Sequence, residues 1–338
     1  MKNIFIILGN GFSIDFLNHL KSKTESCADN IALSNLFENG ELVPWPGDDS
    51  CGFLSYKHCP NLWTLGARPN LSPEASLSLI ENIITCANVI NSKKLQVDSI
   101  YIRAYRELAL YLKALFIYYD KKVDVPKINS SEWGWAKYFQ HINTSGEVDK
   151  VHLVTLNYDI WLERVLQEVG IDFHVSGFDS KETKFNIYKP HGSISFAHKQ
   201  IKVKEFFNIN HTEDIVDVNL KEFELKYANL NALGLMHAMI PPAGDSARLN
   251  FKWANEIRNS ICEISESLSE NDEVVICGIS YWHVDRLELD NILTSIGPNV
   301  SEVTIVNPFS PEVFNAVTTT LFKNVKLFKN SQPLVQNG

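Results

Sequence analysis

Short apolar runs alternate with helical patterns through much of the chain, and they predict the order of its elements. Residues Ile4 to Leu8 (IFIIL) form a wholly apolar, β-prone run, which is typical of a central parallel strand covered on both faces. Apolar residues at helical spacing follow it as far as Leu20. The alternation resumes at Val151 and continues to Val306, so a repeated strand-and-helix arrangement is expected.

The later elements can be placed by the same patterns. Strands are predicted at 152–156, 172–175, 185–188, 235–240, 273–279 and 302–306, and helices at 160–169, 250–268 and 284–296. This alternation indicates an α/β fold with a doubly wound, mostly parallel, Rossmann-like sheet. Right-handed crossovers would then bring the carboxyl ends of the strands to one edge of the sheet.

The stretch after the first helix has a different pattern. Prolines and glycines interrupt it as far as Pro73, and one or two short helices are expected there. Longer helices are then predicted at 72–91, 101–119 and 133–142. We therefore expect residues 25–145 to form a largely helical inserted subdomain. Residues 1–24 and 146–330 are expected to form the Rossmann-like domain around it.

Composition narrows the class of protein. The chain has 338 residues, of which 45% are hydrophobic, and its net charge is −9. A large core can form, and the basic surface of a duplex-binding protein is not expected. An acidic chain can still bind a dinucleotide, because helix N-termini and backbone amides hold phosphate.

Several features favour a cytoplasmic protein without a metal site. The opening apolar run is too short for a signal peptide, and no apolar run is long enough to cross a membrane. The six cysteines include no CxxC pair. Cys51, His58 and Cys59 could be interpreted as a metal cluster, but their spacing matches no common zinc pattern, and a structural role is favoured.

A glycine-containing loop follows the first strand. Gly9, Asn10, Gly11, Phe12 and Ser13 (GNGFS) would let the backbone approach a diphosphate and direct a helix N-terminus at it. The loop lacks the third glycine of the GxGxxG pattern and the lysine of a Walker A loop. An ordinary strand-to-helix turn, with Ser13 as the helix cap, explains it equally well in isolation.

Two further strings stand where predicted strands end. In TLNYD (155–159), Asn157 could hold a ribose or a water, and Asp159 could accept a hydrogen bond from an amide. Helix capping by either residue is the structural alternative. In KPHGS (189–193), His191 could act as a general base near neutral pH, or it could be a structural histidine.

The last two strand ends carry similar residues. Gly278 would permit close approach of an adenosine or phosphate, and Ser280 could bond a phosphate oxygen. Asn307 could meet an adenine or ribose edge. Turn and capping roles explain these positions equally well, and Asp285 is expected to cap the helix that follows.

These strings, in this order, resemble the sirtuin (SIR2) superfamily. Sirtuins carry a GAGIS-like loop, a TQNID-like string, an HG pair, a GTS-like string and a late IN pair. The matching strings here are GNGFS (9–13), TLNYD (155–159), HG (191–192), GIS (278–280) and VN (306–307). The resemblance implies that Asn157 and His191 are catalytic and that Asp159 lies near the nicotinamide amide. It also implies that NAD is bound by Gly9, Asn10, Gly11, Phe12, Ser13, Gly278, Ser280 and Asn307.

The departures from the sirtuin pattern are informative. Sirtuin deacylases have two cysteine pairs for zinc between the HG and GTS strings, whereas this chain has only Cys262 and Cys277 there. Leu156 stands where TQNID has glutamine. The sequence is closer to the SIR2-like domains of bacterial antiphage systems, whose members hydrolyse NAD. The resemblance therefore implies an NAD hydrolase that acts in defence by depleting NAD, with NAD as substrate and no zinc.

Two other functions remain open. An NAD-dependent protein deacylase would share the pocket, although the missing cysteine pairs argue against it. A non-enzymatic module that binds NAD or ADP-ribose is disfavoured because both the asparagine and the histidine are present. The resemblance also makes a HerA-type ATPase a plausible partner, and the apolar helical insertion is a candidate interface for a homo-oligomer.

Overall fold

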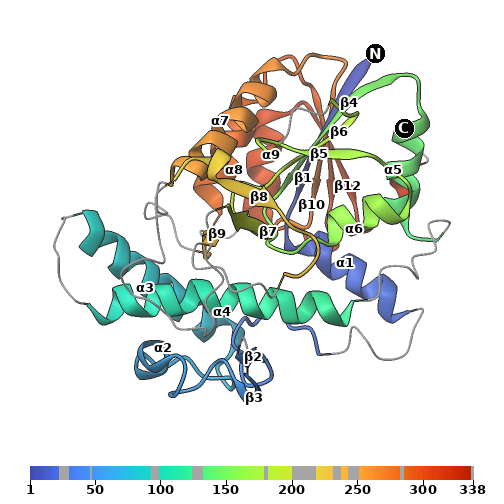
Figure 1. The fold of residues 1–338 in the computed structure, drawn as a ribbon. Helices are drawn as coiled ribbons and strands as arrows, with labels where there is room; N and C mark the ends of the chain where they lie inside the picture. The colour runs from blue at the N-terminus through green and yellow to red at the C-terminus, as the bar shows by residue number, and fades with distance from the viewer. Residues whose placement is uncertain are drawn as a thin grey trace. The chain divides into compact units, whose positions relative to one another are not determined.

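Figure 1 shows the fold of the chain in a computed structural model. It describes residues 1–22, 30–45, 48–92, 99–123, 132–178, 182–199, 218–230, 237–242, 251–281 and 285–335. The chain divides into two compact units. The first comprises residues 1–27, 124–190 and 255–338, and the second comprises residues 28–123 and 191–254.

The first unit is built on a seven-stranded sheet in which all described pairings are parallel. The strands are β1 (Lys2–Leu8), β4 (Val148–Thr155), β5 (Phe173–Val175), β6 (Phe185–Tyr188), β10 (Glu273–Cys277), β11 (Glu302–Val306) and β12 (Asn324–Phe328). Their order is β12-β11-β10-β1-β4-β6-β5. The predicted α/β class with a Rossmann-like parallel sheet is confirmed.

The winding of this sheet changes direction beside β1. From β1 the chain moves to β4 on one side, and from β10 it moves to β11 on the other side. In open α/β sheets, the crevice outside the carboxyl ends of such strands is the usual ligand site. The exits of β1 and β10, with Gly9 and Gly278, lie at this switch point.

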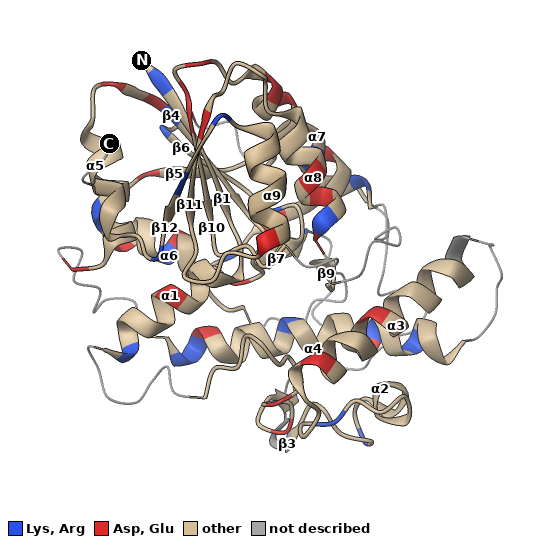
Figure 2. Ribbon diagram, turned by 180° about the vertical axis from the view of Figure 1, so that it is seen from behind, with Lys and Arg blue, Asp and Glu red and all other residues tan. Residues whose placement is uncertain are grey.

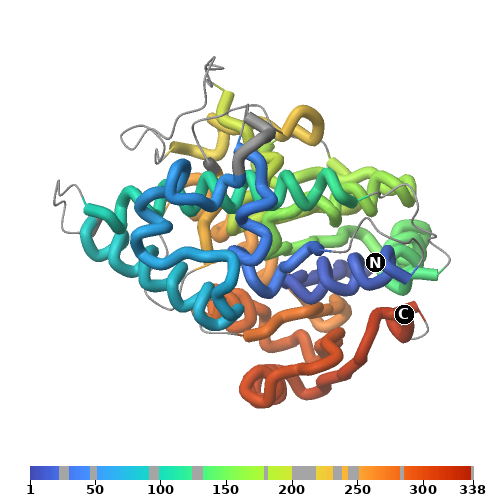
Figure 3. The backbone as a smooth tube through the Cα atoms, turned by 90° about the horizontal axis from the view of Figure 1, so that it is seen from below, coloured from blue at the N-terminus to red at the C-terminus, as the bar shows by residue number. Residues whose placement is uncertain are grey.

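Helices cover both faces of the sheet (Figure 1). One side carries α1 (Asn10–Lys21), α5 (Gly134–Thr144) and α6 (Trp161–Glu168), and the other carries α7 (Lys252–Ser267), α8 (Arg286–Ser295) and α9 (Glu312–Leu321). The C-terminal elements, in red in Figure 3, follow one another at the β12 end of the sheet.

An aromatic cluster holds α1 in place. Its members are Phe12, Phe16, Trp133, Trp135 and Phe139, with ring centroids 5.4–6.4 Å apart in the contacting pairs. All five side chains are buried. Trp133 Nε1 also donates a hydrogen bond to Asp15 Oδ2 at 2.9 Å. This packing fixes the helix that follows the glycine-containing loop.

The second unit combines helices with small antiparallel sheets. Its helices are α2 (Pro60–Thr64), α3 (Pro73–Ser92) and α4 (Ile100–Lys122), and its strands are β2 (Pro44–Trp45), β3 (Asp48–Gly52), β7 (Gly192–His198), β8 (Phe223–Leu225) and β9 (His237–Met239). β2 pairs with β3, and β7 lies between β8 and β9. Helices α3 and α4 pack against each other.

The division into units differs from the predicted domains in two stretches. Residues 191–254 group with the helical unit, although the prediction placed them in the Rossmann-like domain. Helix α5 groups with the sheet, because η3 (Gln332–Val335) packs against it and its aromatic residues cover α1. Most predicted elements are confirmed in position, and β6 and β11 match their predicted bounds.

Five strands and one helix of the structure were not predicted. They are β2, β3, β7, β8, β12 and α9. β12 has the burial pattern of a half-exposed edge strand, so its apolar signal is weak.

Among the described residues, no helix combines the length and apolar character that a membrane crossing requires. In the described parts of the chain, lysine and arginine are spread over several elements and alternate with acidic residues (Figure 2).

Candidate functional site

The loops at the exits of β1 and β10 pack backbone against backbone. Gly11 N donates to the Gly278 carbonyl at 3.0 Å, and Gly9 N donates to the Cys277 carbonyl at 2.9 Å. A Cβ atom placed on Gly278 would lie 2.3 Å from Gly11 Cα, and Gly278 has a φ of +61°. Glycine is therefore required at 11 and 278 by the contact between the two loops.

This contact leads to a prediction about stability. Gly278→Ala should lower the free energy of unfolding by about 2 kcal/mol or more, because it adds both a clash and a strained φ. Gly170→Ala shares the positive φ (+72°) but meets nothing within 4 Å, so it should cost about 1 kcal/mol. Gly146→Ala has neither problem, and a change within about 0.5 kcal/mol is expected.

Denaturant unfolding of the three variants measures these differences. Equal losses for Gly278→Ala and Gly170→Ala would show that the loop contact contributes nothing beyond the backbone conformation.

A buried hydrogen-bond network connects the glycine-containing loop to the TLNYD string. Asn157 Nδ2 donates to the Gly9 carbonyl at 3.0 Å and to Ser13 Oγ at 2.9 Å. Ser13 Oγ donates to Asp159 Oδ2 at 2.8 Å. Asp159 Oδ1 accepts a hydrogen bond from Trp161 N at 3.1 Å. Four of the sequence-predicted site residues, Gly9, Ser13, Asn157 and Asp159, are thus joined in one network.

The chemistry of these groups fixes the direction of each hydrogen bond. A carbonyl and an ionised carboxylate can only accept, so the Asn157 atom that faces Gly9 must be the amide nitrogen. The Ser13 hydroxyl gives its proton to Asp159 and therefore accepts from Asn157. The Asn157 Oδ1 atom then points away from this network, and the side chain is only half-buried. Asn157 consequently offers an oriented acceptor at the carboxyl edge of the sheet.

Asp159 is the electrostatically unusual member of the network. It is 4% exposed, and burial raises the pKa of its carboxyl group to about 6. Lys189 and the hydrogen bonds from Ser13 and Trp161 act in the opposite direction, and Glu163 adds a smaller raising effect. The carboxylate is therefore ionised at neutral pH and can hold the Ser13 proton as described.

The structure corrects the predicted capping roles in this region. Ser13 does not cap α1: the helix begins at Asn10 with Gly9 as its N-cap, so Ser13 lies inside it. The N-cap of α6 is Ile160, but Asp159 still binds the free amide of Trp161. Asp285 stands at the N-cap of α8 without a side-chain capping bond.

The remaining predicted residues of the first unit have different surroundings. Phe12 is buried in the aromatic cluster, whereas Asn10 and Ser280 are exposed. Asn307 Nδ2 donates to the Ile279 carbonyl at 2.9 Å, which ties the exit of β11 to that of β10. Asn307 thus adjoins the switch point.

His191 is the first residue of the second unit. Its side chain is 2% exposed, and its carbonyl accepts a hydrogen bond from Ile240 N at 3.0 Å. The following glycine has a φ of +79°, and a Cβ atom there would lie 1.7 Å from the Ala238 carbonyl oxygen. The HG pair therefore has a structural role where β7 meets β9, in addition to any chemical role of the imidazole.

Two charged residues contact the network but were not among the predicted site residues. Lys189 Nζ donates to Glu163 Oε1 at 2.8 Å and to the Asp159 carbonyl at 2.6 Å. Both side chains have no exposed surface. Lys189 stands inside the KPHGS string, but Glu163 gave no signal, because a glutamate in a short amphipathic helix normally faces solvent.

The fold and this site define an α/β protein with a polar network at the switch point of a parallel sheet. Comparison with models of known protein families and with curated proteins finds no match for the chain. The resemblance to SIR2-like proteins therefore rests on the five motif strings.

Proposed function

We propose that the chain hydrolyses the bond between nicotinamide and ribose in NAD, giving nicotinamide and ADP-ribose. The observation that carries the proposal is the fixed orientation of Asn157 at the edge of the sheet where dinucleotides usually bind. The amide oxygen of Asn157, which points away from the network, suits a ribose hydroxyl or a water molecule. The order of the five motif strings supports the same reading.

The reaction passes through a state in which the ribose carries positive charge, as in glycoside hydrolysis. Nicotinamide leaves as a neutral molecule, water forms a new bond to C1′, and one proton is released. In the proposed mechanism Asn157 positions the water or the ribose hydroxyls. His191 accepts the proton as general base.

The proposed biological role is depletion of NAD as an effector of bacterial antiphage defence. Because uncontrolled hydrolysis would kill the host cell, activity is expected to depend on assembly. A homo-oligomer, or a complex with a HerA-type ATPase, would supply this control. The cytoplasm, where NAD is abundant, is the proposed location.

Product analysis tests the activity directly. The purified chain is incubated with NAD, alone and with a co-expressed partner, and the products are separated by chromatography. We expect nicotinamide and ADP-ribose to form in equal amounts even when no acylated peptide is added. If NAD is lost only when an acetylated peptide is present, and the peptide is deacetylated, the protein is a deacylase instead. Binding of NAD without turnover under every condition would favour the non-enzymatic module.

A further inference from the structure

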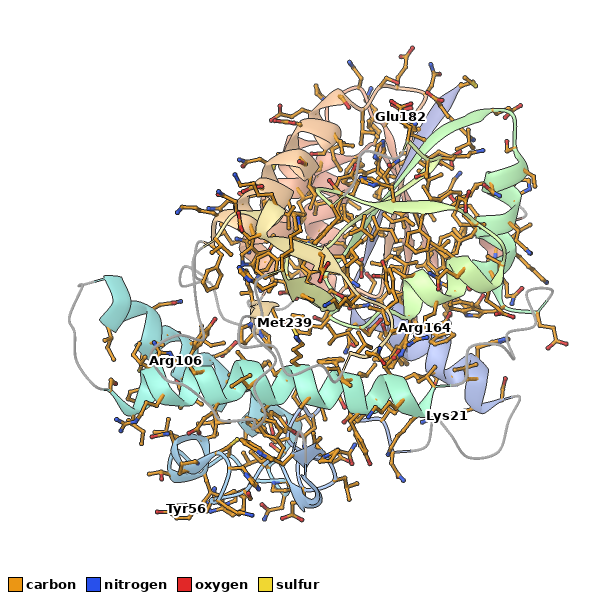
Figure 4. All side chains as sticks on the ribbon, in the orientation of Figure 1. Lys21, Tyr56, Arg106, Arg164, Glu182 and Met239 are labelled. Carbon is orange, nitrogen blue, oxygen red and sulfur yellow. The ribbon has the colours of Figure 1, made fainter. Side chains whose placement is uncertain are left out.

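The ion pair between Lys189 and Glu163 joins two neighbouring strand exits. Lys189 follows β6 directly, and Glu163 lies in the first turn of α6, which follows the exit of β4. β4 and β6 are adjacent and parallel, with Val154 opposite Tyr188. Figure 4 labels Arg164, the residue after Glu163, on the same helix. The Lys189 ammonium group thus contacts both the backbone carbonyl of Asp159 and the Glu163 carboxylate.

The pair is costly to keep in a folded core. Neither side chain has exposed surface, and Glu163 Oε2 is buried without a hydrogen-bond partner in the described part of the chain. Two apolar side chains of similar volume would often stabilise such a site as well or better. A gain in stability therefore explains the presence of this ion pair poorly. A fixed geometry of the two strand exits that it joins explains it better.

We propose that Lys189 and Glu163 are positioning residues, which hold the exits of β4 and β6 at a fixed separation. Asn157 lies just before Asp159 on one exit, and the chain leads from Lys189 to His191 on the other. The inference rests on the proposed function only where it concerns catalysis. The structural part, the cross-link between two strand exits, can be tested without any substrate.

The test replaces the pair by apolar residues. Lys189→Met/Glu163→Leu removes both charges together, so no unpaired charge is left in the core. The exposed pair formed by Lys326 and Glu302 provides a matched control, Lys326→Met/Glu302→Gln, because its side chains are 44% exposed. Melting temperature, amide hydrogen exchange and the kinetics of NAD turnover are measured for each variant.

If the inference holds, the core variant stays folded and only its two strand exits become less protected from amide exchange. In the core variant, amides in peptides covering 155–161 and 186–192 should exchange at least about tenfold faster, while those of β1 and β10 keep their protection. The kcat for NAD should fall at least about tenfold, with KM changed by less than about threefold. The control variant should behave as the wild type.

Unchanged exchange at either strand exit in the folded core variant would overturn the inference. If that variant does not fold, Glu163→Gln decides the question: its weaker bond should speed exchange at both exits about threefold. Unchanged exchange there would overturn the inference too. If the wild type consumes no NAD, the proposed function fails, whereas the exchange results still decide this inference.

Discussion

Asn157→Ala is expected to lower kcat for NAD cleavage by about 10²–10⁴-fold, the largest effect on activity that we predict. The substitution removes the oriented acceptor, and it also removes the donor to the Gly9 carbonyl and to Ser13. The expected loss of stability is about 1–3 kcal/mol, because the carbonyl and the hydroxyl each lose a partner. Turnover of NAD and thermal unfolding, measured together, separate the two effects.

Two other variants sharpen this test. Asn157→Asp keeps the size of the side chain but cannot donate to the Gly9 carbonyl, so it should be at least as inactive as the alanine variant. Asn186→Ala is the matched control, because the Asn186 amide bonds the Thr183 and Lys184 carbonyls at the start of β6. Full activity in Asn157→Ala would contradict the assignment of this residue.

His191→Ala should reduce kcat by a similar factor if the imidazole is the general base. Its backbone contact with Ile240 is retained in the variant, so β7 should keep its pairing with β9. Retention of full activity in a folded His191→Ala protein would remove the general-base role while leaving that of Asn157 intact.

The strands that form the core of the sheet were predictable because local pattern and burial agree there. The β-prone runs at 4–8, 185–188 and 302–306 are all strands of the sheet. β12 was missed because an edge strand is apolar on only part of its surface. β7 was missed because its first residue, Gly192, and the preceding His191 were interpreted as a motif at a strand exit.

The positions of the polar residues at the strand exits were predictable from the sequence, whereas the hydrogen bonds among them were not. The motif strings identified Ser13, Asn157 and Asp159, yet the hydrogen bonds among them join residues that lie 144 and 146 positions apart in the sequence. The pairing of Lys189 with Glu163 depends on the alignment of β4 with β6, which no local pattern specifies. Propensity and periodicity describe single elements, whereas these contacts arise from the tertiary fold.

Asp159→Asn is expected to affect the stability and the activity of the protein differently. At neutral pH the wild-type carboxylate is ionised and buried, and the neutral side chain avoids that desolvation. An asparagine can accept only one of the two hydrogen bonds that Asp159 accepts, from Ser13 and from Trp161 N. If its nitrogen faces Ser13, the hydroxyl must accept from it and competes with Asn157 for the same contact. We expect activity to fall at least about tenfold.

The pH dependence of unfolding gives the sign of the electrostatic effect. The pKa of Asp159 is about 6 in the folded protein and lies near 3.8 in the unfolded chain. Because the folded value is the higher one, stability from this group is fully present below about pH 4 and is lost as the pH rises through about 6. The shift corresponds to about 3 kcal/mol.

The difference in unfolding free energy between the wild type and Asp159→Asn isolates this group, because the other carboxyl groups titrate in both proteins. Relative to the variant, the wild type should lose about 3 kcal/mol between pH 3 and pH 7. Denaturant unfolding at several pH values measures the difference. A flat difference would mean that Lys189 and the two hydrogen bonds offset the desolvation of Asp159, so that its pKa is not raised in the folded protein.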